Sequence, residues 1–566
     1  MGGGLLAMTG SDRKWADLLG RRLSRRTLLK AGAVSGLGLS LWGCAPQAAP
    51  SAPQAQQEGP RRGGTLRLNL MPENPPTLDP YLNVSYRTKI FSGFVYSRLL
   101  KFKYGPDVGA NAFIPGEPDL AERYEISQDG TTWTFYLRKN ARWHNKPPVN
   151  GRPVTAHDVV WAFNRFMKES AERNVFAQVT DVKPVDDYTV QFKLSRPWAP
   201  FLTNISSYFF WVVPREVVEQ YGDASKVVVG SGPFMLENFE SGVSFTFVRN
   251  PDYYEEGRPY VDRVVGLIIP DTATAMAALR AREVDMAGVN PQDLENFKQT
   301  VPDAKIYQWE YLYIPFMYWR ADKPPFNDPR VRQAVSMAID RDEILKVVYN
   351  GEGGWNNFVP WALRSWWLDP KGPEMGPAGK YFKYDPRAAR ELLAAAGYPN
   401  GIKTVLISTP GYGTVWVQYV ELIHAQLKRA GFNVELRMQE YSAYISTTFL
   451  GKFEEGMVWG LQTPFQEPHD FLFGMFHSKG NRNHAHISDP VLDQMIEKQA
   501  ETLNMEERRK LIFDIQRYIA EKMYYVPGSV PYVYWAVHPY VGGYYPYSTT
   551  EYGYAGVMLT KVWLNK

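Results

Sequence analysis

The chain has 566 residues, of which 45% are hydrophobic and 22% are charged. These proportions exclude a largely disordered chain and a protein with many membrane spans, and the length indicates roughly two to four domains. The single Cys excludes an intramolecular disulfide and a cysteine-rich metal site. Without the seven basic and two acidic residues that precede Cys44, 56 basic and 57 acidic residues remain, and this net charge of −1 gives no attraction for nucleic acid.

The N-terminal segment has the features of an export signal. Residues 24–30, SRRTLLK, resemble a twin-arginine motif, and residues 31–43 follow without a charge. That stretch is too short to span a membrane as a mature helix but has the length of a signal-peptide core. LWGC at 41–44 resembles a bacterial lipobox, in which the cysteine receives a diacylglycerol and becomes the new N-terminus. We therefore expect a twin-arginine-type lipoprotein signal peptide over residues 1–43 and a lipid anchor at Cys44.

The next segment is predicted to be a flexible tether over residues 44–60. Its sequence APQAAPSAPQAQQEG has no apolar periodicity and a single charge, so it cannot bury enough surface to fold. A lipid-anchored protein on such a tether works outside the cytoplasmic membrane. This interpretation argues against a role in cytosolic metabolism that depends on ATP or nicotinamide cofactors.

Four segments of the mature chain have the pattern of β-strands. Residues 132–137 and 189–194 alternate apolar and polar side chains, as do residues 434–438. Residues 264–269, VVGLII, form a short apolar run that also predicts a strand.

Helices are predicted between these strands. One begins at Thr272, and two others follow the N-cap pairs Asp328-Pro329 and Asp385-Pro386, the last ending at Gly397. Residues 351–379 are rich in Pro, Gly and Trp and predict a long loop. Strands interspersed with capped helices indicate a mixed α/β architecture.

Motifs for catalysis and cofactor binding are not found in the sequence. It contains no G-x-S-x-G, H-E-x-x-H or G-x-x-x-x-G-K-[ST] motif, so we predict neither an enzyme nor a cofactor. Four of the eight histidines, however, fall close together near residue 480. They are either weak candidates for metal ligands or independent side chains of a polar loop. These histidines are His469, His477, His484 and His486.

Several long runs of the sequence resemble one family. The runs include GGTLRLNL from Gly63, the segment Leu120 to Arg165, GSGPFMLENFESGVSFTFVRNPDYY from Gly230, PPFNDPRVRQAVSMAIDRDEIL from Pro324 and HPYVGGY from His538. They resemble the extracytoplasmic solute-binding proteins of ABC importers, and within them the oligopeptide, dipeptide and nickel-binding family, solute-binding protein family 5. The resemblance covers nearly all of the mature chain.

The resemblance implies an α/β, two-lobed periplasmic-binding-protein-like fold with an additional subdomain and a hinge between the lobes. The hinge would lie where the chain crosses near residues 288–291 and again near 529–532. The implied division is lobe I at 61–105, 225–288 and 531–566, a subdomain at 106–224, and lobe II at 289–530.

The function that the resemblance implies is transport. The protein would capture a peptide or another oligomeric small solute between its lobes and deliver it, as a monomer, to the permease subunits of an ABC transporter. Oligosaccharides and nickel or other metal chelates are alternative ligands. An enzyme or a purely structural lipoprotein on the same fold is a third reading.

By the same similarity, the ligand cleft draws on polar and aromatic residues of both lobes. Peptide binders of the family usually place an Asp in a W-x-x-D-Y-x-x-P type segment, where it pairs with the peptide ammonium group. Here that position corresponds to Pro464, with Gln462 two residues before it, so a buried ammonium group has no counterion. The implied ligand-binding residues are Ser85, Tyr86, Tyr313, Tyr318, Tyr441, Trp459, Gln462, Thr463 and Gln466.

Overall fold

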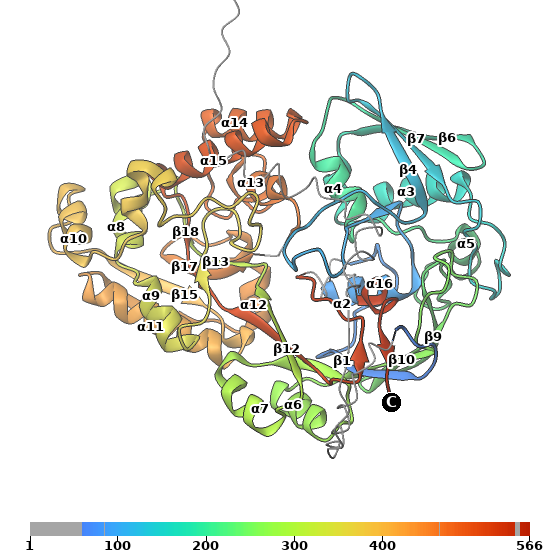
Figure 1. Ribbon diagram of the computed structural model, residues 1–566. Helices are drawn as coiled ribbons and strands as arrows, with labels where there is room; N and C mark the ends of the chain where they lie inside the picture. Colours follow the sequence, from blue (N-terminus) through green and yellow to red (C-terminus); the bar gives the residue numbers. More distant parts are fainter. Residues whose placement is uncertain (1–58, 84, 463–464, 549–554) are drawn as a thin grey trace, which may run out of the picture. The chain divides into compact units, whose positions relative to one another are not determined.

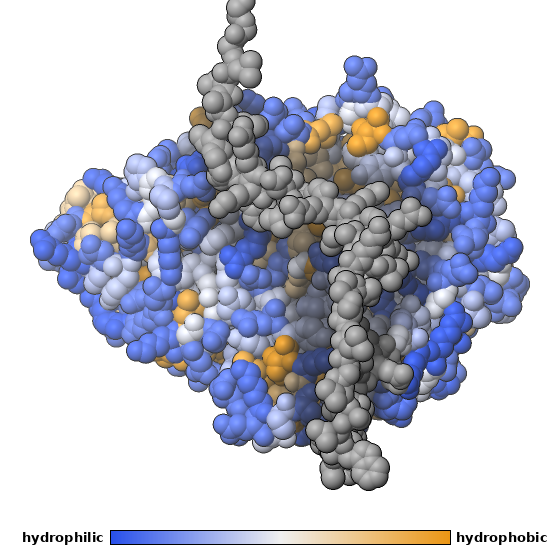
Figure 2. All heavy atoms as spheres, in the orientation of Figure 1, coloured by the Kyte–Doolittle hydropathy of each residue, from blue (hydrophilic) through white to orange (hydrophobic). Residues whose placement is uncertain are grey.

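The computed structural model describes residues 59–83, 85–462, 465–548 and 555–566 (Figure 1). The predicted signal peptide, the anchor Cys44 and nearly all of the predicted tether lie outside the described residues. Among the residues that are described, no helix combines the length and the apolar composition needed to cross a bilayer. On the face shown in Figure 2, the described residues are mostly hydrophilic and apolar residues appear as separate patches. The apolar side chains are instead gathered in the interior.

The first sheet has seven strands that come from distant parts of the chain. In spatial order they are β12 (Lys305–Glu310), β20 (Tyr532–Val537), β11 (Met286–Val289), β1 (Thr65–Met71), β10 (Arg263–Ile268), β9 (Ser244–Arg249) and β8 (Phe234–Glu240). β1 is parallel to β10 and β11, whereas the outer strands pair antiparallel. The strand predicted at 264–269 is confirmed as β10.

The pairing of strand β12 does not follow the predicted division of the chain into lobes. It lies within the range 289–530 that we assigned to lobe II. Nevertheless it pairs with β20 along its whole length, from Lys305 opposite Val537 to Glu310 opposite Tyr532. The first sheet therefore continues past residue 289, and the division into lobes stays a prediction.

Helices pack against the first sheet, and their apolar side chains belong to two separate hydrophobic clusters. The helices concerned are α2 (Tyr86–Val95), α16 (Ala555–Leu559), α6 (Thr272–Arg280) and α7 (Leu294–Thr300). α2 packs through Phe94, whose ring stacks on Phe247 of β9 at a centroid distance of 4.3 Å. α6 and α7 form the second cluster, in which Leu279 and Phe297 are fully buried. The helix predicted from Thr272 is confirmed.

The second sheet is a four-stranded antiparallel unit. Its strands in order are β4 (Ala121–Ile126), β5 (Thr132–Leu137), β7 (Thr189–Leu194) and β6 (Val179–Asp186). The strands predicted at 132–137 and 189–194 are confirmed, and β5 buries every second side chain as its alternation predicts. Helix α3 (Ala156–Glu169) packs against this sheet and begins with a capping box between Thr155 and Asp158. Two short helices, α4 (Pro200–Ser206) and α5 (Arg215–Tyr221), follow.

The third sheet has five strands. In order they are β16 (Asn433–Met438), β15 (Lys403–Ser408), β17 (Met457–Gln462), β13 (Ile314–Trp319) and β18 (Val526–Pro527). β15 is parallel to β16 and β17, and β13 is antiparallel to β17 and β18. The strand predicted at 434–438 is confirmed as part of β16. Parallel neighbours require crossover connections, which helices supply here.

The helices of this part of the chain are α8 (Pro329–Met337), α9 (Arg341–Val348), α10 (Pro386–Ala395), α11 (Thr414–Arg429), α12 (Tyr441–Ser446), α13 (Pro468–Phe476), α14 (Pro490–Glu501) and α15 (Met505–Lys522). The predicted caps are confirmed, because the side chains of Asp328 and Asp385 accept hydrogen bonds from the first turns of α8 and α10. Gly397, with a φ of +97°, follows the end of α10. The predicted loop at 351–379 contains β14 (Gly354–Trp355) and the start of the 3-10 helix η3 (Pro373–Phe382).

Candidate functional site

A cavity of about 760 Å³ lies between elements of the first and third sheets. Its wall is formed by the first turn of α2, the segment after β11, and the residues that precede β13. The ends of α9 and β17, the start of α11 and one side of α12 complete it. Segments that are more than 300 residues apart in the sequence, such as Ser85 and Gln462, therefore share one cavity.

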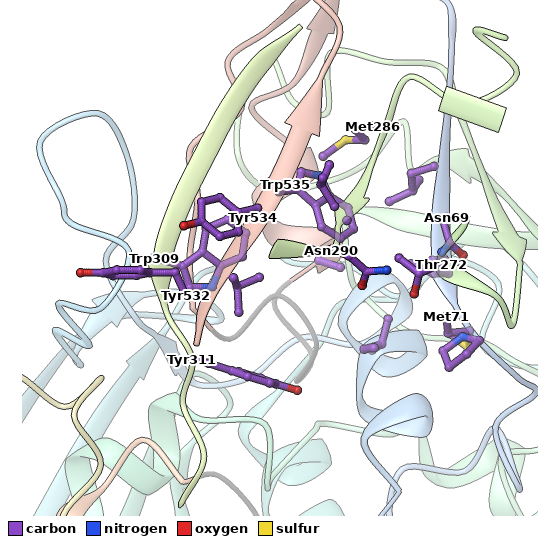
Figure 3. A pocket seen from close by; sticks show the side chains of 18 of the residues that line it. Asn69, Met71, Thr272, Met286, Asn290, Trp309, Tyr311, Tyr532, Tyr534 and Trp535 are labelled. Carbon is purple, nitrogen blue, oxygen red and sulfur yellow. The ribbon is translucent and has the colours of Figure 1, made fainter. Parts of the chain in front are cut away.

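A second cavity, of about 510 Å³, adjoins the first and is shown in Figure 3. Side chains of β12 and β20, among them Trp309, Tyr532 and Trp535, lie opposite Asn69 and Thr272 (Figure 3). The residues that line both cavities are Tyr86, Asn290, Pro291, Tyr311 and Pro531. We call the two cavities together the cleft.

Aromatic side chains form a large part of the wall of the first cavity. Tyr412 makes edge contacts with Trp416 and Tyr441 at centroid distances of 5.3 and 5.6 Å. Tyr311 and Tyr313 contact each other at 4.4 Å. Burial raises the pKa of Tyr313 to about 12, so this ring stays neutral at physiological pH. Such a wall offers flat apolar faces together with hydroxyl groups that can donate and accept hydrogen bonds.

The backbone around Gly411 determines the position of Tyr441. A Cβ atom on this glycine would lie 2.4 Å from Cδ2 of Tyr441. The absence of a side chain therefore lets the tyrosine ring lie directly against the loop that precedes α11. Tyr441 remains 44% exposed in this position.

Five of the predicted ligand-binding residues line the first cavity. They are Ser85, Tyr86, Tyr313, Tyr441 and Gln462. The structure therefore brings together residues from widely separated runs of the sequence. Thr463 and Pro464, by contrast, lie outside the described residues.

Three other predicted residues are placed away from this wall. Tyr318 and Trp459 are fully buried on neighbouring strands of the third sheet. Trp459 packs against Trp416, with a centroid distance of 6.2 Å, and so lies behind a residue that does line the cavity. Gln466, 3% exposed, accepts a hydrogen bond of 2.5 Å from the hydroxyl group of Ser207.

Several residues of the cleft are not among those predicted from the sequence. Tyr412 and Trp416 stand four residues apart in a Gly-rich segment that begins a helix, a spacing that could have indicated one shared face. Arg87 and Asn290 had no such signal, because isolated polar residues at the ends of elements are typical of solvent-exposed turns. Both nevertheless line the first cavity.

Gln462 combines deep burial with a free hydrogen-bonding atom. Its side chain is 3% exposed, and Nε2 lies 3.2 Å from Nδ1 of His484. Oε1 has no hydrogen-bond partner within the described part of the molecule. Burial lowers the pKa of His484 to about 3, so its ring is neutral.

The four clustered histidines are not gathered into one ligand set. Within the described ranges, no group of three or more His, Cys, Asp or Glu side chains is placed to hold a metal ion. The hydrogen-bond partners of their ring nitrogens include Gln499 for His469, Glu497 for His477, Gln462 for His484 and the carbonyl oxygen of Gly451 for His486.

The chain matches a known protein family, several relatives and solved structures. The family model of the bacterial extracellular solute-binding proteins, family 5 (middle part), matches residues 116–483. The chain is 28% identical to the heme-binding protein A of Haemophilus influenzae, over 80% of this chain and 84% of that protein. It is 29% identical to the dipeptide-binding protein of Escherichia coli, over 71% and 77% of the two chains. A solved structure, the ABC transporter-associated periplasmic binding protein DppA of Helicobacter pylori in complex with the peptide STSA, matches with a TM-score of 0.73 and 27% identity, over 89% of this chain and 99% of that one.

Proposed function

The chain belongs to the bacterial extracellular solute-binding proteins of family 5, and we propose that it captures a peptide or a similar oligomeric solute in the cleft for import by an ABC transporter. The observation that carries this proposal is the cleft itself. Its two adjoining cavities measure about 760 and 510 Å³ and are lined from both the first and the third sheet. A site of this size fits a ligand longer than a single amino acid.

Closure between the predicted lobes is the proposed mechanism. The two predicted hinge crossings, at 288–291 and 529–532, contribute Asn290, Pro291 and Pro531 to the cleft wall. A ligand that contacts both sides stabilises the closed form by its differential affinity for that form. The permease subunits would then recognise the closed protein, a monomer. This role is binding and not catalysis.

Native mass spectrometry of the full chain, purified without denaturation, tests the proposal. We expect a bound solute of several hundred daltons, because an enclosed site retains its ligand during purification. After denaturation and refolding, calorimetric titration with a mixture of short peptides should show binding at micromolar or tighter affinity. If peptides do not bind while neutral oligosaccharides do, the assignment of a peptide as the ligand is wrong. The proposed role as a solute-binding protein of an ABC transporter would still hold.

Oligosaccharides are the second candidate because the wall is rich in tyrosine and tryptophan. Flat rings such as Tyr412, Trp416 and Tyr441 can stack on sugar rings, and the hydroxyl and amide groups beside them can hydrogen-bond to sugar hydroxyls. The metal-chelate alternative lacks comparable support, since the clustered histidines bind different partners in the part of the chain that is described.

We further propose that the mature protein is held at the outer face of the cytoplasmic membrane by a lipid on Cys44. Cys44→Ser should move the protein from the membrane fraction to the soluble fraction, because only the thiol can receive the diacylglycerol. Ser51→Ala, in the same predicted tether, is the matched control and should leave the protein in the membrane fraction. Retention of Cys44→Ser on membranes washed with high salt would contradict the anchor.

A further inference from the structure

The charge of the cleft is carried by one side chain. Of the described residues that line the two cavities, only Arg87 is charged at neutral pH, and none is a carboxylate. A ligand ammonium group placed in this cleft would therefore meet a cation and no carboxylate of the described lining. A ligand carboxylate would meet a guanidinium group, its preferred bidentate partner.

The position of Arg87 at the N-terminus of a helix strengthens its attraction for an anion. It lies in the first turn of α2, a turn that also places Ser85 and Tyr86 on the wall of the first cavity. The Ser85 side chain makes no cap hydrogen bond, and the turn contains no acidic residue. The positive end of the helix dipole and the charge of Arg87 therefore act in the same direction.

Glu73 occupies only part of the Arg87 guanidinium group. Its carboxylate lies 2.9 Å from Nη2, and its side chain is 66% exposed. An ion pair with so exposed a partner contributes little stability. Nε of Arg87 is buried and has no hydrogen-bond partner among the described residues. The ion-pair partner of the guanidinium group is thus a well-solvated carboxylate, which a ligand carboxylate can displace.

Gln462, at the end of β17, supplies a second polar side chain to the wall of the first cavity. It is one of the buried wall residues, and one atom of its amide has no partner in the described part of the chain. Since the ring of His484 is neutral, its Nδ1 can accept from Nε2 of Gln462 or, in the other tautomer, donate to Oε1. In the second arrangement Nε2 takes the position of Oε1, which has no hydrogen-bond partner among the described residues, and can donate a hydrogen bond there.

We infer that the cleft selects solutes with a carboxylate group, which Arg87 binds at the N-terminus of α2, and does not require a free ammonium group. This inference rests on the proposed function, because it concerns the ligand of the same cleft. Two kinds of solute carry the required chemistry: peptides, through their C-terminus, and acidic oligosaccharides.

Calorimetric titration of the ligand-stripped full chain tests the inference with three forms of the peptide Ala-Phe-Ala. N-acetyl-Ala-Phe-Ala keeps the carboxylate and lacks the ammonium group, whereas Ala-Phe-Ala amide has the reverse. We expect the acetylated peptide to bind within about threefold of the unmodified one, and the amide to bind at least about tenfold more weakly, because it loses a charge-assisted contact. Trigalacturonate and maltotriose form the matching acidic and neutral sugar pair.

Two variants with opposite expected effects locate the preference at Arg87. Arg87→Gln should bring the affinities of the acetylated and amidated peptides to within about threefold of each other. Glu73→Gln should tighten binding of the acetylated peptide by about two- to fivefold, since it removes the competing carboxylate. Arg215→Gln, which removes an exposed arginine of α5 that pairs with Glu219, is the matched control and should leave all affinities unchanged.

The outcomes separate this inference from the proposed function. If the amide binds as tightly as the acetylated peptide, or if Arg87→Gln leaves the preference intact, the inference is wrong although a peptide function stands. If no peptide binds and trigalacturonate binds more tightly than maltotriose, the peptide function is wrong and the carboxylate preference is supported. Equal binding of the two sugars in that case would overturn the inference as well.

Discussion

Replacing Trp459 with Ala is expected to lower the free energy of unfolding by about 3–5 kcal/mol, because the side chain is fully buried in the third sheet. Its indole ring contacts Trp416 and Tyr419 of α11, at centroid distances of 6.2 and 5.2 Å. It also lies against Gly528, where a Cβ atom would be 2.7 Å from the ring. Truncation would leave a cavity between sheet and helix that these neighbours cannot fill. Urea unfolding of the ligand-free protein measures the loss.

Two further variants separate packing from ligand contact. In Trp459→Phe most of the stability should return, since Nε1 of Trp459 has no hydrogen-bond partner among the described residues and the smaller ring loses only volume. Tyr441→Ala removes a ring that is 44% exposed on the cavity wall. It should change the unfolding free energy by less than about 0.5 kcal/mol and weaken ligand binding by about tenfold. A Trp459→Ala protein that unfolds like the wild type but has lost its ligand affinity would return Trp459 to the ligand site.

Alternation along a strand predicted some elements well and could not separate the core from the cleft. In β5 one face is buried and the other half-buried, so the alternating pattern correctly placed Trp133, Phe135 and Leu137 on one buried face. β17 has no such contrast, because Met457 to Gly460 are all buried. An aromatic residue such as Trp459 therefore had the same signature whether it faced a helix or a ligand.

The residues missed by sequence reasoning depend on contacts between distant segments. A lone arginine in the first turn of a helix is most often solvated, and only the closeness of α2 to the third-sheet side of the cleft makes Arg87 part of the cavity wall. The membership of β12 in the first sheet is similar. Its pairing with β20 joins residues about 230 positions apart, as Lys305 opposite Val537 shows, and no local pattern encodes a partner at that separation.

Removal of Arg508 is expected to destabilise the protein by about 3–5 kcal/mol, since it leaves a buried carboxylate without its partner. Arg508 and Glu467 form an ion pair in which the side chains are 4% and 2% exposed. Glu467 also caps α13 by accepting a hydrogen bond of 3.0 Å from the backbone of His469. Arg508 additionally donates to Oε1 of Gln499 at 3.1 Å. This pair therefore joins the start of α13 to α14 and α15.

The double variant Arg508→Met and Glu467→Gln isolates the cost of the unpaired charge. A neutral amide can still cap α13, and the methionine fills part of the volume of the arginine side chain, so most of the lost stability should return. Arg215→Met, which removes one partner of an exposed pair, should change the unfolding free energy by less than about 0.5 kcal/mol. Equal losses in Arg508→Met and in the double variant would mean that lost packing, and not the unpaired Glu467 carboxylate, accounts for the effect.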